Sequence, residues 1–354
     1  MLVSITKLTI KHLCLERKRS YYMLKEQNGR LVDEATGEDV VLHGVNRNGL
    51  ECWSDNSGIF DIVRVALEEW HADTIRLPLS QDRWFGYDKA YTKEEYRAIV
   101  DKLVDFITKD GNYVILDAHY GDYGIWGKRT DGAPRMADLN TVTFWRDIGK
   151  RYANHPYVLY NLYNEPEDIS WEVWRDGGWL EQGGMCFQAA GMQQLIDAVR
   201  DTGAKNPVVL GGLVWASSTI GPAIGWDVDD RGGNGIIMDA HIYPWNGLDW
   251  DADFASVVPT HPLLIGEFGH QGTAMDLGPA CIPREPHEVW MPKLIRWIEE
   301  NKFSYCAWDF DCYAGPCLLK EMENFTPTES HGVYVKDMLY RAWVEKQQKA
   351  GKKA

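Results

Sequence analysis

Short apolar runs, each followed by a polar loop and a segment of helical periodicity, recur along most of this chain. Counting them gives eight predicted strands, centred near residues 42, 75, 115, 159, 209, 238, 265 and 306. The runs are apolar throughout rather than alternating, as expected for strands that are covered on both faces. Repeated strand–helix units predict a parallel sheet, and eight of them predict an α/β fold closed into a (β/α)8 TIM barrel.

Helices are predicted between the strands from the spacing of apolar residues. Thr92 and Glu95 have capping-box spacing, and Gly111 is expected to stop the helix that they open. Asn140 is expected to cap the helix over 140–153. The other predicted helices are 59–70, 185–202, 289–300 and a last one at 335–346.

The N-terminal part of the chain carries a hairpin signal. Asn28-Gly29 lies between the extended segments 21–25 and 30–33, so a small β-hairpin is expected to cap the underside of the barrel. No linker divides the chain, which predicts one domain over 21–346, with residues 1–20 as a leader and 347–354 as a tail. Charged residues interrupt the leader, so it lacks the apolar core of a signal peptide, and no segment reaches transmembrane length.

Composition narrows the possible partners. A net charge of −15 and a pI near 5.1 argue against nucleic acid and anionic membranes, because both attract clustered Lys and Arg. The 16 Trp and 17 Tyr are expected mostly in the core, although some can form flat platforms for sugar rings. Seven cysteines without CxxC spacing leave at least one unpaired within the chain and do not favour a zinc site.

Two of the apolar runs lead into a glutamate, Glu165 within Asn164-Glu165-Pro166 and Glu267 within Gly266-Glu267-Phe268. Folding alone explains this poorly, because ionised carboxylates are rarely buried without a partner. Other predicted strands also end in polar or aromatic residues: Asn46, Arg76, His119, Asn164, His241, Tyr243 and Trp308. In a TIM barrel such residues gather at one mouth, where catalytic groups lie.

Taken in order, this set of strand-end residues resembles the active-site signature of glycoside hydrolase family 5, a cellulase family with catalytic glutamates on strands four and seven. The run Leu42-His43-Gly44-Val45-Asn46 is also similar to that family's first strand, and the resemblance covers roughly residues 20–345. It implies a retaining β-glycosidase that acts on β-1,4-linked polysaccharide, with no cofactor and no metal.

The resemblance also implies a role for each residue. Glu165 would be the general acid and then the general base, and Glu267 the nucleophile, which Arg76 and Tyr243 are placed to keep ionised. Their carboxyl groups should lie about 5–5.5 Å apart. Asn164 would donate to the sugar 2-hydroxyl. His119 and His241 would bind the sugar or orient Asn164 and Glu165, and Trp308 would stack under the ring at the cleavage subsite.

Further residues are expected around the cleft. Aromatic platforms for the polymer are predicted at Trp53, Trp84, Trp126, Trp215 and Trp245, and His43 and Asn46 are expected to support the site. Trp171, Trp174 and Trp179 follow Glu165 in a long loop that could wall one side. Asp309 and Asp311 depart from the family pattern; either they bind sugar hydroxyls at a remote subsite or they face water.

The leading hypothesis is an endo-β-1,4-glucanase that acts as a monomer on polysaccharide or oligosaccharide, outside the cell or in the periplasm. A β-1,4-mannanase has the same constellation, because loops read the orientation of the 2-hydroxyl. A sugar-binding barrel without catalysis is the rival of another class, disfavoured because both glutamates are present. A metal-dependent hydrolase ranks low, because His119 and His241 have no adjacent carboxylate-rich ligand set.

Overall fold

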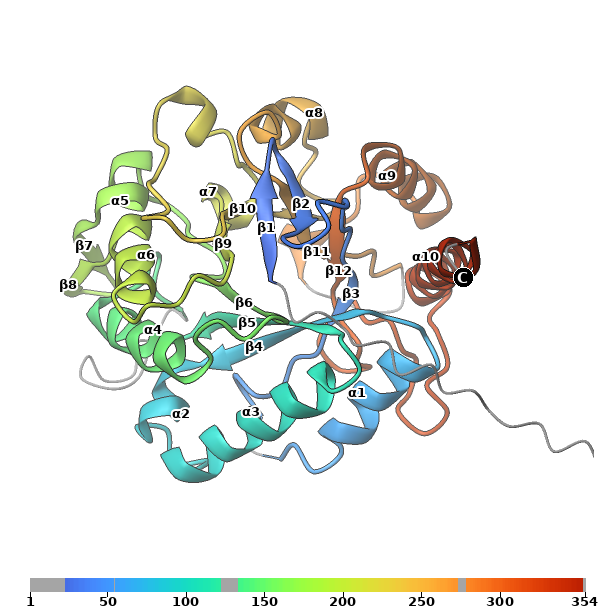
Figure 1. Cartoon of the computed structure of the whole chain (residues 1–354), viewed down its shortest axis with the longest axis horizontal. Helices are drawn as coiled ribbons and strands as arrows, with labels where there is room; N and C mark the ends of the chain where they lie inside the picture. The colour runs from blue at the N-terminus through green and yellow to red at the C-terminus, as the bar shows by residue number, and fades with distance from the viewer. Residues whose placement is uncertain (1–22, 54, 122–132, 273–277, 353–354) are drawn as a thin grey trace, which may run out of the picture.

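Eight parallel strands close into a barrel at the centre of the molecule (Figure 1). The computed structural model describes residues 23–53, 55–121, 133–272 and 278–352. The barrel strands are β3 (His43–Asn46), β4 (Thr74–Ser80), β5 (Tyr113–Tyr120), β6 (Val158–Asn161), β9 (Val208–Gly211), β10 (Ile236–Ile242), β11 (Leu263–Phe268) and β12 (Ser304–Ala307). Pairing of β12 with β3 closes the sheet, which confirms the predicted α/β barrel.

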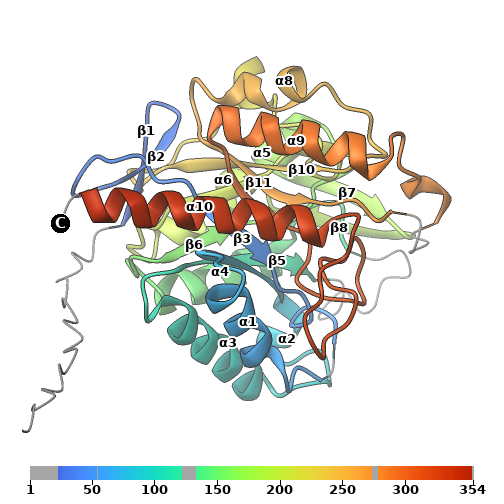
Figure 2. The ribbon, with the colours of Figure 1, turned by 90° about the vertical axis from the view of Figure 1, so that its right-hand side faces the viewer.

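Helices cover the outside of the barrel, and α10 runs along its outer wall (Figure 2). They are α1 (Ile59–Glu68), α2 (Gln81–Phe85), α3 (Lys93–Thr108), α4 (Leu139–Arg151), α5 (Trp171–Asp176), α6 (Met192–Arg200), α7 (Leu213–Ala216), α8 (Trp250–Asp253), α9 (His287–Asn301) and α10 (Gly332–Lys352). The capping box at α3 is confirmed: the Thr92 hydroxyl accepts from the Glu95 amide, and the Glu95 carboxylate accepts from the Thr92 amide. Helix α10 is longer at both ends than the expected 335–346.

A hairpin closes the N-terminal end of the barrel, as predicted. Strands β1 (Leu24–Gln27) and β2 (Arg30–Asp33) meet at the Asn28-Gly29 turn, where both residues have positive φ. Leu24 and Leu31 are buried together with residues from six barrel strands and with Leu42, directly before β3. The strand residues are Ile115, Leu159, Val209, Ile237, Leu264 and Cys306. This contact leaves the opposite, C-terminal mouth as the open end.

Two local expectations are wrong. The predicted helix over 185–202 is a hairpin followed by a shorter helix: β7 (Gly178–Gln182) and β8 (Met185–Ala189) precede α6. Gly183-Gly184 makes the turn with positive φ at both positions, a two-residue signal that favours a hairpin. Helix α4 is capped by Asp138 and not by Asn140, because the Asp138 carboxylate accepts from the amides of Asn140 and Thr141.

The predicted leader, residues 1–20, lies outside the described residues, so the expected domain bounds stay a prediction. Among the residues that the structure does describe, no helix is both long and apolar enough to cross a membrane.

Candidate active site

The strand-end residues meet at the C-terminal mouth. Asn46, His119 and His241 lie in the last part of β3, β5 and β10, and Glu267 lies in β11. Arg76 was expected to end its strand, but it is the third residue of β4, which continues to Ser80. Asn164 and Glu165 follow β6, Tyr243 follows β10, and Trp308 follows β12. Contacts described below join most of these side chains, so seven of the eight strands supply one continuous cluster.

Glu165 and Glu267 face each other across a short gap. One carboxylate oxygen of each, together with a nitrogen of His241, lie within 4.8 Å of one another. Inverting glycosidases hold their two carboxyl groups about 6.5–9.5 Å apart to make room for a water, whereas retaining enzymes keep them about 5–5.5 Å apart. The observed separation therefore suits direct attack by one carboxylate.

The two glutamates have different surroundings. Both oxygens of Glu267 are held: Oε1 accepts from Arg76 Nη1 at 3.0 Å, and Oε2 accepts from the Tyr243 hydroxyl at 2.8 Å. The Glu267 side chain is 6% exposed and that of Glu165 is 30% exposed. Burial raises the pKa of the Glu267 carboxyl above its usual value, although His241 and Arg76 oppose this shift. Glu165 is thus the more open of the pair.

His241 bridges the two glutamates. Its Nδ1 lies 2.8 Å from Glu165 Oε1 and 3.5 Å from Glu267 Oε2, and its Nε2 lies 3.5 Å from Asp239 Oδ2. Burial alone would lower the pKa of this imidazole, but the charges of Glu267 and Asp239 and hydrogen bonds to Asp239 and Glu165 raise it to about 10. His241 is therefore a cation at neutral pH, and its Nδ1 donates to Glu165.

Arg76 is the fully buried centre of the cluster. Besides Glu267, it donates to the side-chain oxygens of Asn46, Asn161 and Asn164, at 2.9, 3.0 and 2.6 Å. Burial would lower the pKa of its guanidinium, but the carboxylates of Asp117, Glu267 and Asp239 raise it. Asn46 in turn donates to the carbonyl of Gly266 at 2.8 Å, so it supports the strand that carries Glu267.

Asp117 and Asp239 are site residues that the sequence analysis missed. Each stands two positions before a predicted histidine, in the repeated tripeptides Asp117-Ala118-His119 and Asp239-Ala240-His241. Side chains two apart on a strand point to the same side, so this repeat places an aspartate beneath each histidine, next to Arg76. Asp117 Oδ2 lies 2.7 Å from His119 Nδ1 and 3.1 Å from Arg76 Nη2. The repeat was the signal that could have found both residues.

Aromatic rings line two sides of the site. The rings of His119 and Trp308 are nearly parallel, with centroids 5.5 Å apart. Tyr243 stacks on Trp245 at 4.7 Å, so Trp245 backs the tyrosine that holds Glu267. Burial and the charge of Glu267 raise the pKa of Tyr243 well above its usual value, which keeps its hydroxyl protonated as a donor.

Tryptophans that follow Glu165 differ in exposure. Trp215 is 51% exposed, and its amide donates to the carbonyl of Pro166, directly after Glu165. Trp174 is buried, and its indole donates to the carbonyl of Gly211, so it does not wall the cleft. Trp179 is 73% exposed on β7.

Two expected site residues lie elsewhere, and a third cannot be placed. Trp84 is fully buried on α2, and its indole donates to Asp147 at 2.8 Å, so it is a core residue and not a platform. His43 begins β3, where its Nδ1 lies 3.0 Å from Asp73 Oδ2, so it stands at the opposite end of the barrel from the site. Trp126 falls outside the described residues.

The acidic pair after Trp308 is buried, so it does not face water. Asp311 pairs with Arg47 at 3.1 Å and accepts from the amide of Tyr313. Within the described part of the chain, neither carboxyl oxygen of Asp309 has a hydrogen-bond partner. Burial and the charge of Asp311 raise the pKa of Asp309 well above its usual value.

Among the described residues, Glu165, His241 and Glu267 form the one group of acidic, histidine or cysteine side chains close enough to surround an ion. Both carboxylate oxygens of Glu267 already accept hydrogen bonds, from Arg76 and from Tyr243, so this group fits a cation poorly.

Known proteins share both the sequence pattern and the fold. Endoglucanase MaCel5A of Microbulbifer sp. is 26% identical over 77% of this chain, and the chain spans only 48% of that relative. The major extracellular endoglucanase of Xanthomonas campestris is 26% identical over 80% of this chain and 64% of its own length.

Among solved structures, a β-glucanase from Saccharophagus degradans in complex with cellotetraose has a TM-score of 0.70 at 22% identity, covering 92% of this chain and 94% of that one. The catalytic domain of Thermobifida fusca endoglucanase Cel5A has a TM-score of 0.65 at 18% identity, over 90% and 98% of the two chains. A model of the family described as Cellulase (glycosyl hydrolase family 5) matches residues 33–313. The chain therefore belongs to glycosyl hydrolase family 5.

Proposed function

We propose that this chain is a retaining endo-β-1,4-glucanase. The observation that carries the proposal is the spacing of Glu165 and Glu267, whose nearest oxygens lie within 4.8 Å of each other at the open mouth of the barrel. The relatives named as endoglucanases agree with it.

In the first step, the ionised carboxylate of Glu267 attacks the anomeric carbon and forms a glycosyl ester. Glu165 donates its proton to the glycosidic oxygen as the bond to the leaving sugar breaks. The surroundings favour this division of roles: Glu267 is fixed by Arg76 and Tyr243, whereas Glu165 is more exposed and can exchange a proton with solvent.

In the second step, Glu165 acts as the base. It removes a proton from a water that attacks the anomeric carbon from the side the leaving group vacated, and Glu267 departs as a carboxylate. Two inversions restore the β configuration, and Glu165 ends protonated for the next cycle. His241, which contacts both carboxylates, stabilises whichever of them is charged.

Substrate contacts follow from the remaining side chains. Arg76 donates a hydrogen bond to Oδ1 of Asn164. The side-chain NH2 of Asn164 is then left to donate to the sugar 2-hydroxyl. The Trp308 ring stacks under the sugar at the cleavage point, and the nearly parallel ring of His119 supports it. Trp215, exposed beside Pro166, supplies a platform for the leaving sugar.

The enzyme acts on a polymer, so we place it outside the cell or in the periplasm, as a monomer. The test is a panel of barley β-glucan, carboxymethylcellulose, xyloglucan and glucomannan, with product sizing and NMR of the first-formed anomer. A rapid fall in chain length with initial β-anomer supports a retaining endoglucanase. Preference for glucomannan over every glucan would assign a mannanase instead, and binding without hydrolysis would assign a non-catalytic barrel.

A further inference from the structure

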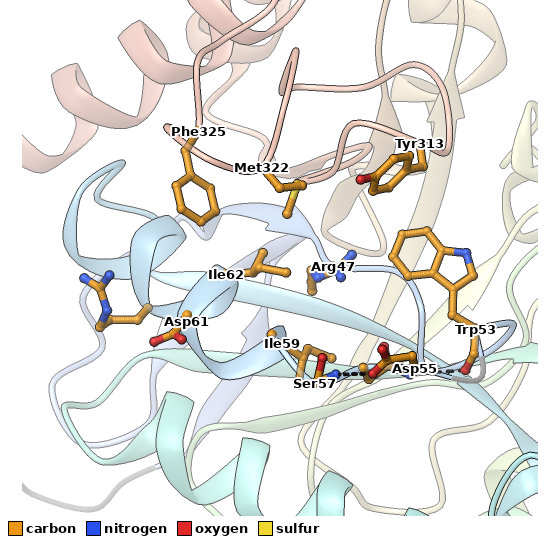
Figure 3. Close-up of a pocket in the computed structure, with 13 residues that line it drawn as sticks. Arg47, Trp53, Asp55, Ser57, Ile59, Asp61, Ile62, Tyr313, Met322 and Phe325 are labelled. Carbon is orange, nitrogen blue, oxygen red and sulfur yellow. Dashed lines mark hydrogen bonds between the residues drawn. The ribbon is translucent and has the colours of Figure 1, made fainter.

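The loop that joins β12 to α10 begins at Trp308 and ends at His331. Its outer part faces helix α1 across a pocket of about 930 Å³, into which Tyr313, Met322 and Phe325 project from the loop (Figure 3). Packing of the loop against α1 is therefore incomplete. Because of this, the position of Trp308 depends on contacts at the two ends of the loop.

His331 joins these two ends. Its Nε2 donates to the Trp308 carbonyl at 2.7 Å. The His331 ring is fully buried and meets the ring of Phe268, the residue after Glu267, edge to face at 5.8 Å. The Trp308 amide donates to the Phe268 carbonyl at 3.0 Å. Both backbone polar groups of Trp308 are thus held, one by the strand that carries Glu267 and the other by His331.

Gly269 makes room for the bond between His331 and Trp308. A Cβ atom at this position would lie 3.0 Å from each of three atoms: Nε2 of His331, the carbonyl oxygen of Trp308 and Cβ of Pro316. Non-bonded heavy atoms pack best at about 3.5–4.0 Å. A side chain at position 269 would therefore push His331 and Trp308 apart.

Packing alone does not explain a histidine at position 331. Burial lowers the pKa of His331 to about 3, so its ring is neutral and carries its single proton on Nε2. In the part of the chain that the structure describes, Nδ1 is then a buried acceptor without a partner. Such an unpaired group is unfavourable, and a phenylalanine would fill the same space without it. What the histidine adds is the donor to Trp308.

We propose that His331 is a positioning residue of the active site, which orients the Trp308 ring under the sugar through the Trp308 carbonyl. The inference rests on the proposed function, in which Trp308 touches the sugar at the cleavage point. His331 is buried behind the tryptophan and acts on the substrate only through it. Because the ring supports the sugar at the reacting centre, a small displacement of the ring should slow the reaction more than it weakens binding.

The experiment is a double-mutant cycle on the polysaccharide that the wild-type enzyme cleaves fastest. His331→Phe keeps a buried ring but removes the donor, so kcat should fall by about 10- to 100-fold, the effect of a misplacement of about 1 Å, while KM changes much less. His331→Gln places an amide nitrogen where Nε2 stood and should retain most of kcat. In the Trp308→Ala background, His331→Phe should have no further effect, because the ring on which it acts is gone.

A matched control and an independent variant complete the design. His261 is also a buried histidine whose Nδ1 has no partner among the described residues, and its Nε2 lies 2.9 Å from Asp227. It lies just before β11, at the hairpin end of the barrel, so His261→Phe should leave kcat unchanged. Gly269→Ala should lower kcat as His331→Phe does. Circular dichroism gives the folded fraction of each variant, and rates are compared per folded molecule.

Three results would overturn the inference: wild-type kcat in His331→Phe, a loss in His331→Gln as large as that in His331→Phe, or losses from His331→Phe and Trp308→Ala that add in the double variant. Failure of the proposed function looks different, because the wild-type enzyme would then hydrolyse no polysaccharide. The same cycle is then measured by calorimetry of cellohexaose binding, where additive losses again overturn the inference.

Discussion

Arg76 and Glu267 form a buried ion pair, with Nη1 and Oε1 3.0 Å apart, although 191 positions separate them. The pair ties the second strand of the barrel to the seventh. It orients the carboxylate that the proposed mechanism uses as nucleophile, and the Tyr243 hydroxyl holds its other oxygen at 2.8 Å. A nucleophile held at both oxygens needs little reorganisation before it attacks.

Glu267→Ala should abolish turnover of β-glucan, with kcat falling by at least about 10⁴-fold, as expected when a covalent nucleophile is lost. Azide should restore cleavage of an aryl glycoside by entering the vacated space and attacking the anomeric carbon directly. One displacement inverts the centre, so the product should be the α-glycosyl azide, identified by NMR. Glu300→Ala, an exposed change on α9, is the control. A β-glycosyl azide from the Glu267 variant would contradict its assignment as nucleophile.

Glu165→Ala should behave differently. A dinitrophenyl leaving group departs without a proton, so the first step with an aryl cellobioside should be spared while cleavage of natural glucan is lost. The glycosyl ester with Glu267 should then accumulate, visible as a burst of dinitrophenol. Azide now attacks that ester and should give the β-glycosyl azide. Equal losses on activated and natural substrates would exclude Glu165 as the acid.

The sequence was sufficient to predict where the two glutamates lie in the barrel. Glu165 and Glu267 come at the end of an apolar run, and the parallel barrel brings such ends to one mouth. Arg76 lies within β4 instead, and its long side chain reaches Glu267 from there. His43 was misplaced because it starts its strand instead of ending it, so it points to the hairpin end. Trp84 was misplaced because the short helix α2 follows β4 directly and turns the indole into the core.

Contacts between loops were beyond sequence reasoning. The ion pair between Arg47 and Asp311 depends on the conformations of two loops, which apolar periodicity does not predict. Asp117 and Asp239 could have been found, because the repeated Asp-Ala-His puts an acid on the same strand face as each histidine.

His241 should make stability depend on pH above neutrality. Its pKa is about 10 in the folded protein and about 6.5 when unfolded, because Glu165, Glu267 and Asp239 surround it. Between these two pH values, the folded state therefore binds more protons than the unfolded state. The stabilisation by protonated His241 is complete below about pH 6.5 and is lost as the pH rises through about 10. The free energy of unfolding, measured with urea, should decline from pH 7 to 10. His241→Asn should make this decline smaller. His71→Gln is the control, because burial lowers the pKa of His71 and it does not titrate in this window. An unchanged slope in His241→Asn would contradict the protonated state of His241.

Arg76→Met should destabilise the fold strongly, because it leaves Asp117, Asp239 and Glu267 buried without the cation that all three face. Breaking a buried pair by removing one partner costs about 3–5 kcal/mol, and here the carboxylates also repel one another. Lowering the pH protonates Glu267, whose pKa burial raises, and so weakens the repulsion. The difference in unfolding free energy from wild type should therefore shrink toward pH 4. The control is Arg231→Met, which breaks ion pairs with Asp197 and Asp229 at the surface, where solvent screens the charges, and should cost far less at any pH. The prediction is wrong if Arg76→Met loses no more unfolding free energy than this control, or if its loss stays constant with pH. Either result would show that the three carboxylates do not depend on Arg76 for their charge.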